Sequence, residues 1–495
     1  MCSGEVSALQ IRQTPWDTTP SPDHGQTNRS RRIVKLTFRI HSLLILLAAA
    51  ALLAVVWASV CTVERIYWNP TRLAAAYAVA HGLDPYAPQA SAAQLGWLYG
   101  PVYALVYAPV AAIPDLSCAF MAAALINTIL YALPAVLLAW IVWRTWRSAA
   151  FAALAALTLT TAYSDTFLWI HVDVIAATLG IVALWALLLA RESRSPCGWV
   201  GLAAMAAALA PWAKQLAVAV PAAMAAWLWW SGERRRAIQF SALAAGATLL
   251  LTAGFVQWFG ADALWFSMVV RPAKIPFSLQ TGAISAGRLF FTGGLWFVVG
   301  ILLLWLRARQ RPGDDHLYRI TLPVTWLAVT SLPLGLIACF KLGGGPNSIH
   351  ALYYATAWLA LLATWLWRNC PTSRIAVATI LLLGALNGIR DHLVRGVYWM
   401  PTHYQRETLA WAKAHQGHAY FPWNPLVTIL TDHKVYPTED ALYYQRLTGL
   451  QSPPAALAAA VPSDAIIVYH DPEPRGAAVA ELRNARKWVA LHNGP

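Results

Sequence analysis

The chain has 495 residues, of which 58% are apolar and 12% are charged, and its formal net charge is +14. Soluble proteins carry about 45–50% apolar and about 25% charged residues, so this composition excludes a soluble globular enzyme, a disordered protein and a fibrous protein. Lys and Arg occur in short groups between apolar runs. The positive charge therefore indicates the orientation of membrane helices rather than nucleic-acid binding.

Apolar runs of membrane-spanning length begin after a polar tail. Residues 1–42 are polar and rich in Pro and Ser, which predicts a disordered cytoplasmic tail, and no cleavable signal peptide is visible. A helix needs about 20 apolar residues to cross a bilayer. Run 101–113 is too short and is predicted to be re-entrant or juxtamembrane. Eleven spans are predicted, at 43–63, 117–143, 149–163, 173–190, 197–213, 216–230, 237–259, 289–306, 318–340, 350–367 and 374–389.

The distribution of positive charge orients these spans. With the N-terminus in the cytoplasm, the cytoplasmic segments hold 19 Lys and Arg residues and the outer loops hold 7. Residues 390–495 are more polar; 465–469 reads as a buried strand and 475–491 as an amphipathic helix. The predicted fold is a polytopic α-helical membrane protein of about 11 transmembrane helices (43–389) with a small extracytoplasmic α/β C-terminal domain.

Polar residues gather in the predicted outer loops and at the helix ends beside them. Placing a polar or charged side chain in the membrane costs free energy, so residues kept there are candidates for a function. The first outer loop, residues 64–100, contains Glu64, Asn69, Arg72, Asp84 and Tyr99 among turn-forming prolines and glycines. An interfacial loop with polar caps is the alternative interpretation of this segment.

A second outer loop carries Asp165, His171 and Asp173. The carboxylates suit a base, a metal ligand or hydrogen bonding to a sugar, although an Asp at a helix N-terminus also serves as a plain cap. Further along, Lys214 and Gln215 lie between two apolar runs. The Lys either extends to the interface or holds a phosphate.

A glycine-rich turn follows Lys341 and leads to Asn347. Successive glycines let backbone amides form a concave anion site beside a helix N-terminus. Arg271 adds outer positive charge against the positive-inside tendency, which favours an anionic ligand. Together, these loops indicate an enzyme acting on a lipid-linked, phosphate-bearing substrate at the outer leaflet.

The sequence resembles the GT-C superfamily of membrane glycosyltransferases, most closely the bacterial polyprenyl-phosphate-mannose-type and aminoarabinose-transferase-type branches. The resemblance covers roughly residues 40–450. The motifs that carry it are Gly82–Tyr86, Tyr99–Pro101, His171–Asp173, Lys214–Gln215 and Gly343–Asn347.

The resemblance implies roles for individual residues. The family's catalytic base in the first outer loop falls near Asn69, where this sequence has no carboxylate, so Glu64 or Asp84 would substitute. Asp173 matches the family's second acidic position. By the same likeness, Lys214 and Lys341 would contact the carrier phosphate. Some relatives use a divalent metal ion, so a metal cofactor is left open, with no ligand set assigned here.

The implied reaction transfers a sugar from a polyprenyl-phosphate donor to a glycan, lipid or protein acceptor with inversion. The resemblance implies that it occurs at the outer face of the bacterial cytoplasmic membrane. Glu64 or Asp84, helped by Asp173, would deprotonate the acceptor hydroxyl as the catalytic base. Lys214, Lys341 and Arg271 would stabilise the leaving phosphate. The alternatives are another glycolipid enzyme, a transporter of glycolipid, ion or solute, and a non-catalytic glycolipid-binding relative. Polar groups collect at one face here, whereas transporters place them at the midplane.

Overall fold

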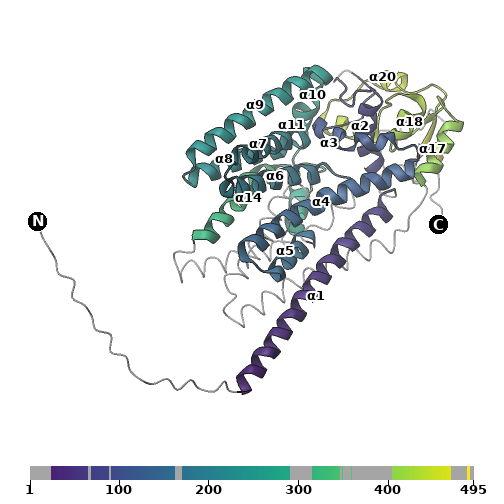
Figure 1. The fold of residues 1–495 in the computed structure, drawn as a ribbon. Helices are drawn as coiled ribbons and strands as arrows, with labels where there is room; N and C mark the ends of the chain where they lie inside the picture. The colour runs from purple at the N-terminus through teal and green to yellow at the C-terminus, as the bar shows by residue number, and fades with distance from the viewer. Residues whose placement is uncertain are drawn as a thin grey trace, which may run out of the picture.

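The computed structural model is mostly helical, with one small sheet near the C-terminus (Figure 1). It describes residues 24–64, 68–88, 91–161, 170–289, 315–345, 348, 358, 404–469 and 488–490. Within these residues, five helices are long and apolar enough to cross a membrane, in agreement with the predicted polytopic architecture. They are Ser42–Cys61, Leu116–Trp146, Val172–Glu192, Pro196–Ala213 and Arg234–Phe259.

The predicted spans that fall on described residues coincide with helices. Spans 289–306, 350–367 and 374–389 lie outside the described residues, apart from Leu289 and Trp358. The helices at the remaining spans are α1 (His24–Thr62), α4 (Leu116–Trp146), α5 (Ala149–Thr161), α6 (Val172–Glu192), α7 (Pro196–Ala213), α8 (Ala219–Trp230), α9 (Arg234–Phe259) and α14 (Asp315–Cys339).

Helix α1 corrects the prediction for the N-terminal tail, because it begins at His24 and residues 24–42 are helical rather than disordered. No Pro or Gly occurs between Gln26 and Thr62 to interrupt a helix that the apolar span has already nucleated. The residues before His24 lie outside the described part of the chain.

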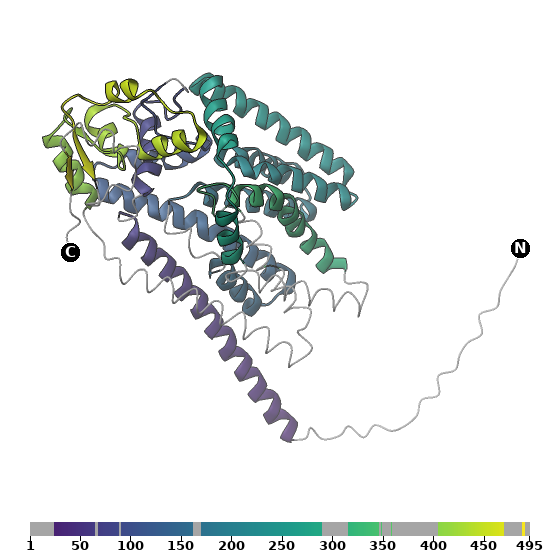
Figure 2. The ribbon, with the colours of Figure 1, turned by 180° about the vertical axis from the view of Figure 1, so that it is seen from behind.

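The helices pack as a bundle with a compact interior of small residues. Helices α6 and α7 lie against each other and run in opposite directions, because only residues 193–195 connect them. Helix α7 also packs on α9, while α1 packs on α4 and α5 (Figures 1 and 2). The buried face of α7 is mostly alanine, which lets neighbouring helix backbones approach closely.

Short helices of the first outer loop and its continuation cover one end of the bundle. They are α2 (Trp68–Ala80), α3 (Pro101–Tyr107) and the 3₁₀ turn η1 (Ala108–Ala112). Residues 101–112, predicted as a re-entrant or juxtamembrane segment, thus form two short helical pieces. A second group of short elements follows α9 and comprises α10 (Ala261–Trp265), the π-helical turn η3 (Phe266–Val270), α11 (Arg271–Lys274) and α12 (Leu279–Leu289).

The C-terminal residues form a small α/β unit. Its three parallel strands lie in the order β1 (Ala419–Tyr420), β2 (Ile466–Tyr469) and β3 (Trp488–Ala490). Strand β2 confirms the predicted buried strand, and Ile467 is fully buried. The predicted helix at 475–491 is wrong at its end, because Trp488–Ala490 pair with β2 as a strand. The helices of this unit are α17 (Tyr404–Ala414), α18 (Pro425–Asp432), α19 (Glu439–Thr448) and α20 (Pro454–Ala459).

The C-terminal unit lies at the end of the bundle that α2 and α3 cover (Figures 1 and 2). Glu64, just past α1, accepts a hydrogen bond from the backbone N–H of Gln405 at 3.0 Å. Thr71 of α2 donates to the Trp423 carbonyl at 3.0 Å, and α18 packs on α2. Thr438 donates through its hydroxyl to the Leu95 carbonyl, also at 3.0 Å. The first outer loop is therefore the surface on which the C-terminal unit docks.

Gly100→Ala is expected to destabilise the contact between α3 and α7. A Cβ on Gly100 would lie 1.8 Å from the Trp212 carbonyl oxygen, so the two helices must separate, at a cost of about 1–3 kcal/mol. The thermal midpoint of the purified protein in detergent measures this. Gly201→Ala is the matched control on α7, because nothing lies within 4 Å of that position and Ala is the better helix former. Equal midpoints for the two variants would contradict the close approach.

Candidate functional site

An ion pair joins the start of α6 to the end of α7. Asp173 lies in the first turn of α6, and Lys214 directly follows α7; because the helices run antiparallel, both side chains lie at the same end of the bundle. The Lys214 ammonium donates to the Asp173 carboxylate, and the His171 ring contacts the other carboxylate oxygen. All three residues are buried, with 7% or less of each exposed. The structure thus unites three residues that the sequence singled out.

His171 supports this pair without adding charge. Its side chain caps α6, and its backbone N–H donates to the amide oxygen of Asn127 at 3.3 Å. Burial, followed by the nearby Arg72, lowers the pKa of His171 to about 4. The ring is therefore neutral at pH 7, which leaves Asp173 and Lys214 as the compensated charges.

Arg72 on α2 connects the ion pair to the C-terminal unit. Its guanidinium interacts electrostatically with His171 on one side and with Asp440 and Tyr444 of α19 on the other. Its Nε and Nη1 atoms are buried, and neither has a hydrogen-bond partner among the described residues. We refer to Arg72, His171, Asp173, Lys214 and Asp440 as the Arg72 cluster.

Aromatic residues border the Arg72 cluster. Tyr99 and Tyr103 both interact electrostatically with Arg72, and the Tyr103 and Tyr107 rings lie 4.8 Å apart. The Tyr107 hydroxyl donates to the Asn127 amide oxygen at 3.1 Å, the same atom that the His171 backbone reaches. Tyr103 and Tyr107 are fully buried, so of these three rings Tyr99 is the one that is partly exposed beside the cluster.

Gln215 and Arg271 extend the site along the first outer loop. Gln215 donates to the carbonyls of Leu98 and Met268, which places the residue after Lys214 against the loop. Arg271 donates to the side-chain oxygen of Gln94 and lies over the Phe266 ring at 4.7 Å. Burial lowers the pKa of Arg271 to about 10, so the side chain stays charged at pH 7. Its Nε is buried with no hydrogen-bond partner among the described residues.

Lys341 lies near this region but is held by backbone atoms. Its ammonium donates to the carbonyls of Pro272 and Ala273, at the end of α11. Cys339, two residues earlier, is within electrostatic reach of Lys214 and Asp173, so the glycine-rich turn follows close behind the ion pair. The structure therefore places Lys341 beside the Arg271 segment rather than in the Arg72 cluster.

The two candidate bases of the first outer loop, Glu64 and Asp84, and Asn69 at the family's base position all have other contacts. Asn69 is fully buried, donates to the Val63 carbonyl at 2.9 Å and accepts from the Ile170 N–H at 3.0 Å. Glu64 accepts from the first turn of α17, as described above. Asp84 is exposed and accepts from the Tyr86 N–H in its own turn at 2.7 Å. Asp165 and Asn347 lie outside the described residues.

The C-terminal unit contributes two acidic residues that the sequence reasoning missed. Glu439 and Asp440 begin α19, where Thr438 is the N-cap and accepts from the Ala441 N–H. A Thr-Glu-Asp run at a helix start is an ordinary capping pattern, so its composition carries no functional signal. Burial raises the pKa of Glu439 and of Asp440 to about 7 each, opposed by Arg446 and by Arg72 respectively.

No group of three or more His, Cys, Asp and Glu side chains that could hold a metal ion occurs within the described ranges. His171 and Asp173, the pair for which the sequence left a metal open, are engaged with each other and with Lys214. These residues therefore do not form a metal-binding set, and no step proposed below passes through a metal.

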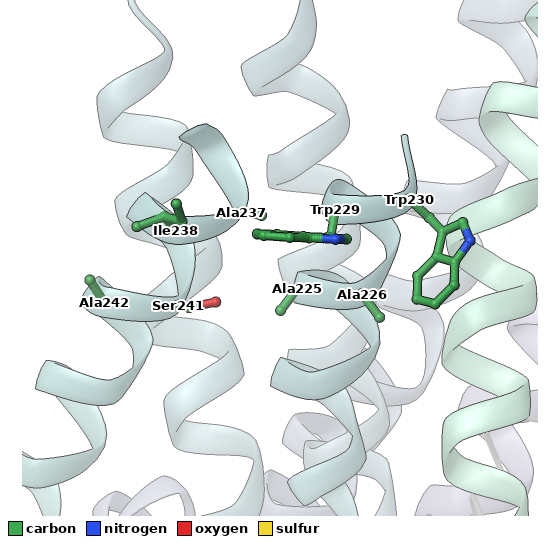
Figure 3. A pocket seen from close by; sticks show the side chains of 8 residues that line it. All are labelled: Ala225, Ala226, Trp229, Trp230, Ala237, Ile238, Ser241 and Ala242. Atoms are coloured by element: carbon green, nitrogen blue, oxygen red, sulfur yellow. The ribbon is translucent and has the colours of Figure 1, made fainter. Parts of the chain in front are cut away.

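An apolar groove lies between α8 and α9 (Figure 3). Its volume is about 600 Å³. Ser241 provides the one polar side chain in a lining otherwise made of Ala225, Ala226, Trp229, Trp230, Ala237, Ile238 and Ala242. This lining offers no group for acid–base or nucleophilic chemistry.

Comparisons with known proteins found similarity to solved structures. No family model matches the chain, and no curated protein matches it. The chain is similar to the archaeal oligosaccharyltransferase AglB from Archaeoglobus fulgidus, solved in complex with an inhibitory peptide and a dolichol-phosphate. The TM-score is 0.48 and the identity 12%, and the match covers 79% of this chain and 64% of that one.

Lys214→Met is expected to destabilise the protein by about 3–5 kcal/mol, because it leaves the Asp173 carboxylate buried without its ammonium partner. Adding Asp173→Asn to the same chain should restore most of that loss, since it removes the uncompensated charge. Thermal midpoints of the two single variants and the double variant form the cycle that measures the coupling. Strictly additive losses would show that the two side chains do not stabilise each other.

Glu439→Gln is expected to flatten the pH dependence of stability. The pKa of Glu439 is about 7 in the folded protein and near its usual 4.5 when unfolded, so folding is favoured at low pH. Stability should fall as pH rises from about 4.5 to about 7, by at most about 1.4 kcal/mol per pH unit. Melting curves at pH 5 to 8 measure this. Glu407→Gln, an exposed change on α17, serves as the control and should keep the wild-type slope.

Proposed function

We propose that this protein transfers a sugar from a polyprenyl-phosphate carrier to a glycan, lipid or protein acceptor at the outer face of the bacterial cytoplasmic membrane. The observation that carries the proposal is the Arg72 guanidinium, whose Nε and Nη1 are buried without a partner among the described residues. A buried donor left unpaired costs about 1–3 kcal/mol, and more when it is charged. An anionic ligand with several oxygens would satisfy it.

A phosphate ester fits this site better than other anions do. Arg donates a planar set of N–H groups that matches phosphate oxygens, and charge-assisted hydrogen bonds are strong in a buried setting. Arg271 adds positive charge from a neighbouring element, and Lys214, although paired with Asp173, has further N–H groups to donate. The site lies at the end of apolar helices, so a phosphate bound there can keep an isoprenoid chain among them.

In the proposed reaction, the acceptor oxygen attacks the anomeric carbon of the donor sugar while a base takes the hydroxyl proton. The bond between that carbon and the phosphate oxygen breaks, and polyprenyl phosphate leaves with its negative charge. Arg72, Lys214 and Arg271 stabilise that charge as it develops. Asp173 holds the Lys214 ammonium in place, and Tyr99 borders the position of the sugar. The anomeric configuration inverts.

The membrane orientation belongs to the same proposal. The cytoplasmic segments that hold the excess of Lys and Arg are at the opposite ends of α4, α6 and α9 from the Arg72 cluster. The site and the C-terminal unit then face outward, as the resemblance to GT-C glycosyltransferases implies. The aminoarabinose-type and polyprenyl-phosphate-mannose-type branches supply the donors to try first.

The test uses membranes that overexpress the protein, incubated with polyprenyl-phosphate donors carrying radiolabelled mannose, glucose, aminoarabinose or galacturonic acid. We expect label to leave one carrier and appear in an acceptor. Arg72→Gln should lower that rate about 100- to 1,000-fold, because it removes a donor to the leaving phosphate. Arg144→Gln is the control, since Arg144 pairs with Glu192 on the surface at the other end of α4 and α6.

Two outcomes would contradict the proposal. The first is no transfer from any donor by folded wild-type protein with native acceptor lipids present. The second is wild-type turnover by Arg72→Gln. Movement of an intact labelled donor across the membrane without transfer would indicate a transporter instead.

A further inference from the structure

Helix α19 of the C-terminal unit is locked to the first outer loop at its N-terminus. The Thr438 N–H donates to the Gln94 carbonyl at 3.0 Å, and its hydroxyl donates to the Leu95 carbonyl. At Gly96, φ is +70, and a Cβ there would lie 2.6 Å from the backbone nitrogen of Ala441. The start of α19 and the loop are therefore in backbone contact, with no room for a side chain between them.

The same loop also contacts the end of α7. Three residues past Leu95, the Leu98 carbonyl accepts from Gln215, which directly follows Lys214. The loop segment 94–98 thus lies between the residue next to Lys214 on one side and the N-cap of α19 on the other. This connection places the first turn of α19, with Asp440, near the other members of the Arg72 cluster.

A second connection passes through the arginines. Helix α19 packs against α11, which carries Arg271, and Arg271 donates to Gln94 of the same loop. Tyr444, one turn after Asp440, interacts electrostatically with both Arg72 and Arg271. Asp440 and Tyr444 lie one turn apart on the same face of α19. This face is within electrostatic reach of the two arginines that we assign to the leaving phosphate.

The other carboxylates near the site either have hydrogen-bond or ion-pair partners or are exposed to solvent. Both oxygens of Asp173 have partners, in Lys214 and His171. Glu64 accepts from the Gln405 backbone, and Asp84 is exposed and caps its own turn. Asp440 is partly buried and has Arg72 as its electrostatic partner. Among the described residues near Arg72, Asp440 is the carboxylate for which the structure records no hydrogen bond from an ammonium or a backbone amide.

We propose that Asp440, supplied by the C-terminal unit, is the base that accepts the proton of the acceptor hydroxyl. This inference rests on the proposed glycosyl transfer. The hydroxyl O–H bond breaks as the Asp440 oxygen takes the proton, and the acceptor oxygen forms its bond to the anomeric carbon. The electron pair of the breaking carbon–oxygen bond leaves with polyprenyl phosphate. The C-terminal unit then forms part of the active site.

The surroundings of Asp440 suit a base at neutral pH. Burial raises the pKa of this carboxyl to about 7 and the adjacent Glu439 adds to the effect, whereas Arg72 opposes it. The other ionisable groups nearby are Tyr444 on the same helix and Tyr99 of the first outer loop, which interacts electrostatically with both Tyr444 and Arg72. Proton transfer is most efficient when the pKa of the base is near the working pH. Turnover should therefore increase as pH rises through about 7.

The test compares Asp440→Asn with wild type on the donor that the panel identifies. We expect kcat to fall about 100- to 10,000-fold, the usual contribution of a general base, with no loss of affinity for polyprenyl phosphate, because the change removes a negative charge near Arg72. Asp464→Asn is the matched control, because Asp464 is an exposed carboxylate of the same unit that pairs with His418. Asp440→Glu keeps the carboxylate and should retain partial turnover, with a shifted midpoint in its pH–rate profile.

The outcomes separate this inference from the proposed function. Active wild type together with full turnover by Asp440→Asn overturns the role of Asp440 and leaves glycosyl transfer intact. Loss of turnover in Glu64→Gln or Asp84→Asn but not in Asp440→Asn assigns the base to the first outer loop instead. If Asp440→Asn does not fold, a pH–rate profile of Asp440→Glu identical to that of wild type overturns the inference. Inactive wild type with every donor defeats the proposed function itself.

Discussion

The buried contact between Asp173 and Lys214 is the interaction on which the candidate site depends. Either charge alone at the edge of an apolar bundle would cost several kcal/mol, so the two are stable there only as a pair. Their pairing fixes the start of α6 against the end of α7. Because Gln215 comes next and reaches the Leu98 carbonyl, the pair also determines where the first outer loop lies.

The first outer loop in turn positions the C-terminal unit. Glu64 and Thr71 bind its backbone near one edge, and the carbonyls of Gln94 and Leu95 bind the N-cap of α19. These bonds use backbone atoms of the loop or its partner, so they specify position rather than chemistry. The site thus depends on helix packing and domain docking together, and a change at either contact would disturb both.

Charged side chains at the two ends of the bundle differ in their burial and pairing. Away from the site, Arg144 pairs with Glu192 and Arg191 pairs with Glu233 where solvent still reaches them, and such pairs contribute little stability. At the site, Asp173 and Lys214 are buried, and Arg72 and Arg271 have buried Nε atoms without partners among the described residues. Exposed charges at one end are typical of residues that orient helices in a membrane. Buried charges at the other end are typical of a ligand-binding site.

Several features of the protein followed from the sequence alone. Apolar runs of sufficient length predicted the helices that the structure describes, because crossing a bilayer imposes a length and a composition on each segment. The charged residues kept beside those runs identified His171, Asp173 and Lys214, since only a function or a partner offsets their cost. The strand at 465–469 followed from its short apolar run.

Only the tertiary structure decided which of these residues meet. Asn69, Glu64 and Asp84 are neighbours in one loop, yet the first two hold backbone segments together and the third faces outward. Asp440 lies at a helix start that looks like any other cap, and nothing near it in the chain indicates Arg72. A local sequence pattern indicates whether a segment prefers water or the membrane and whether it forms a helix. The contacts of Arg72 with α6 and α19 arise from packing between segments distant in the chain, and no local preference encodes them.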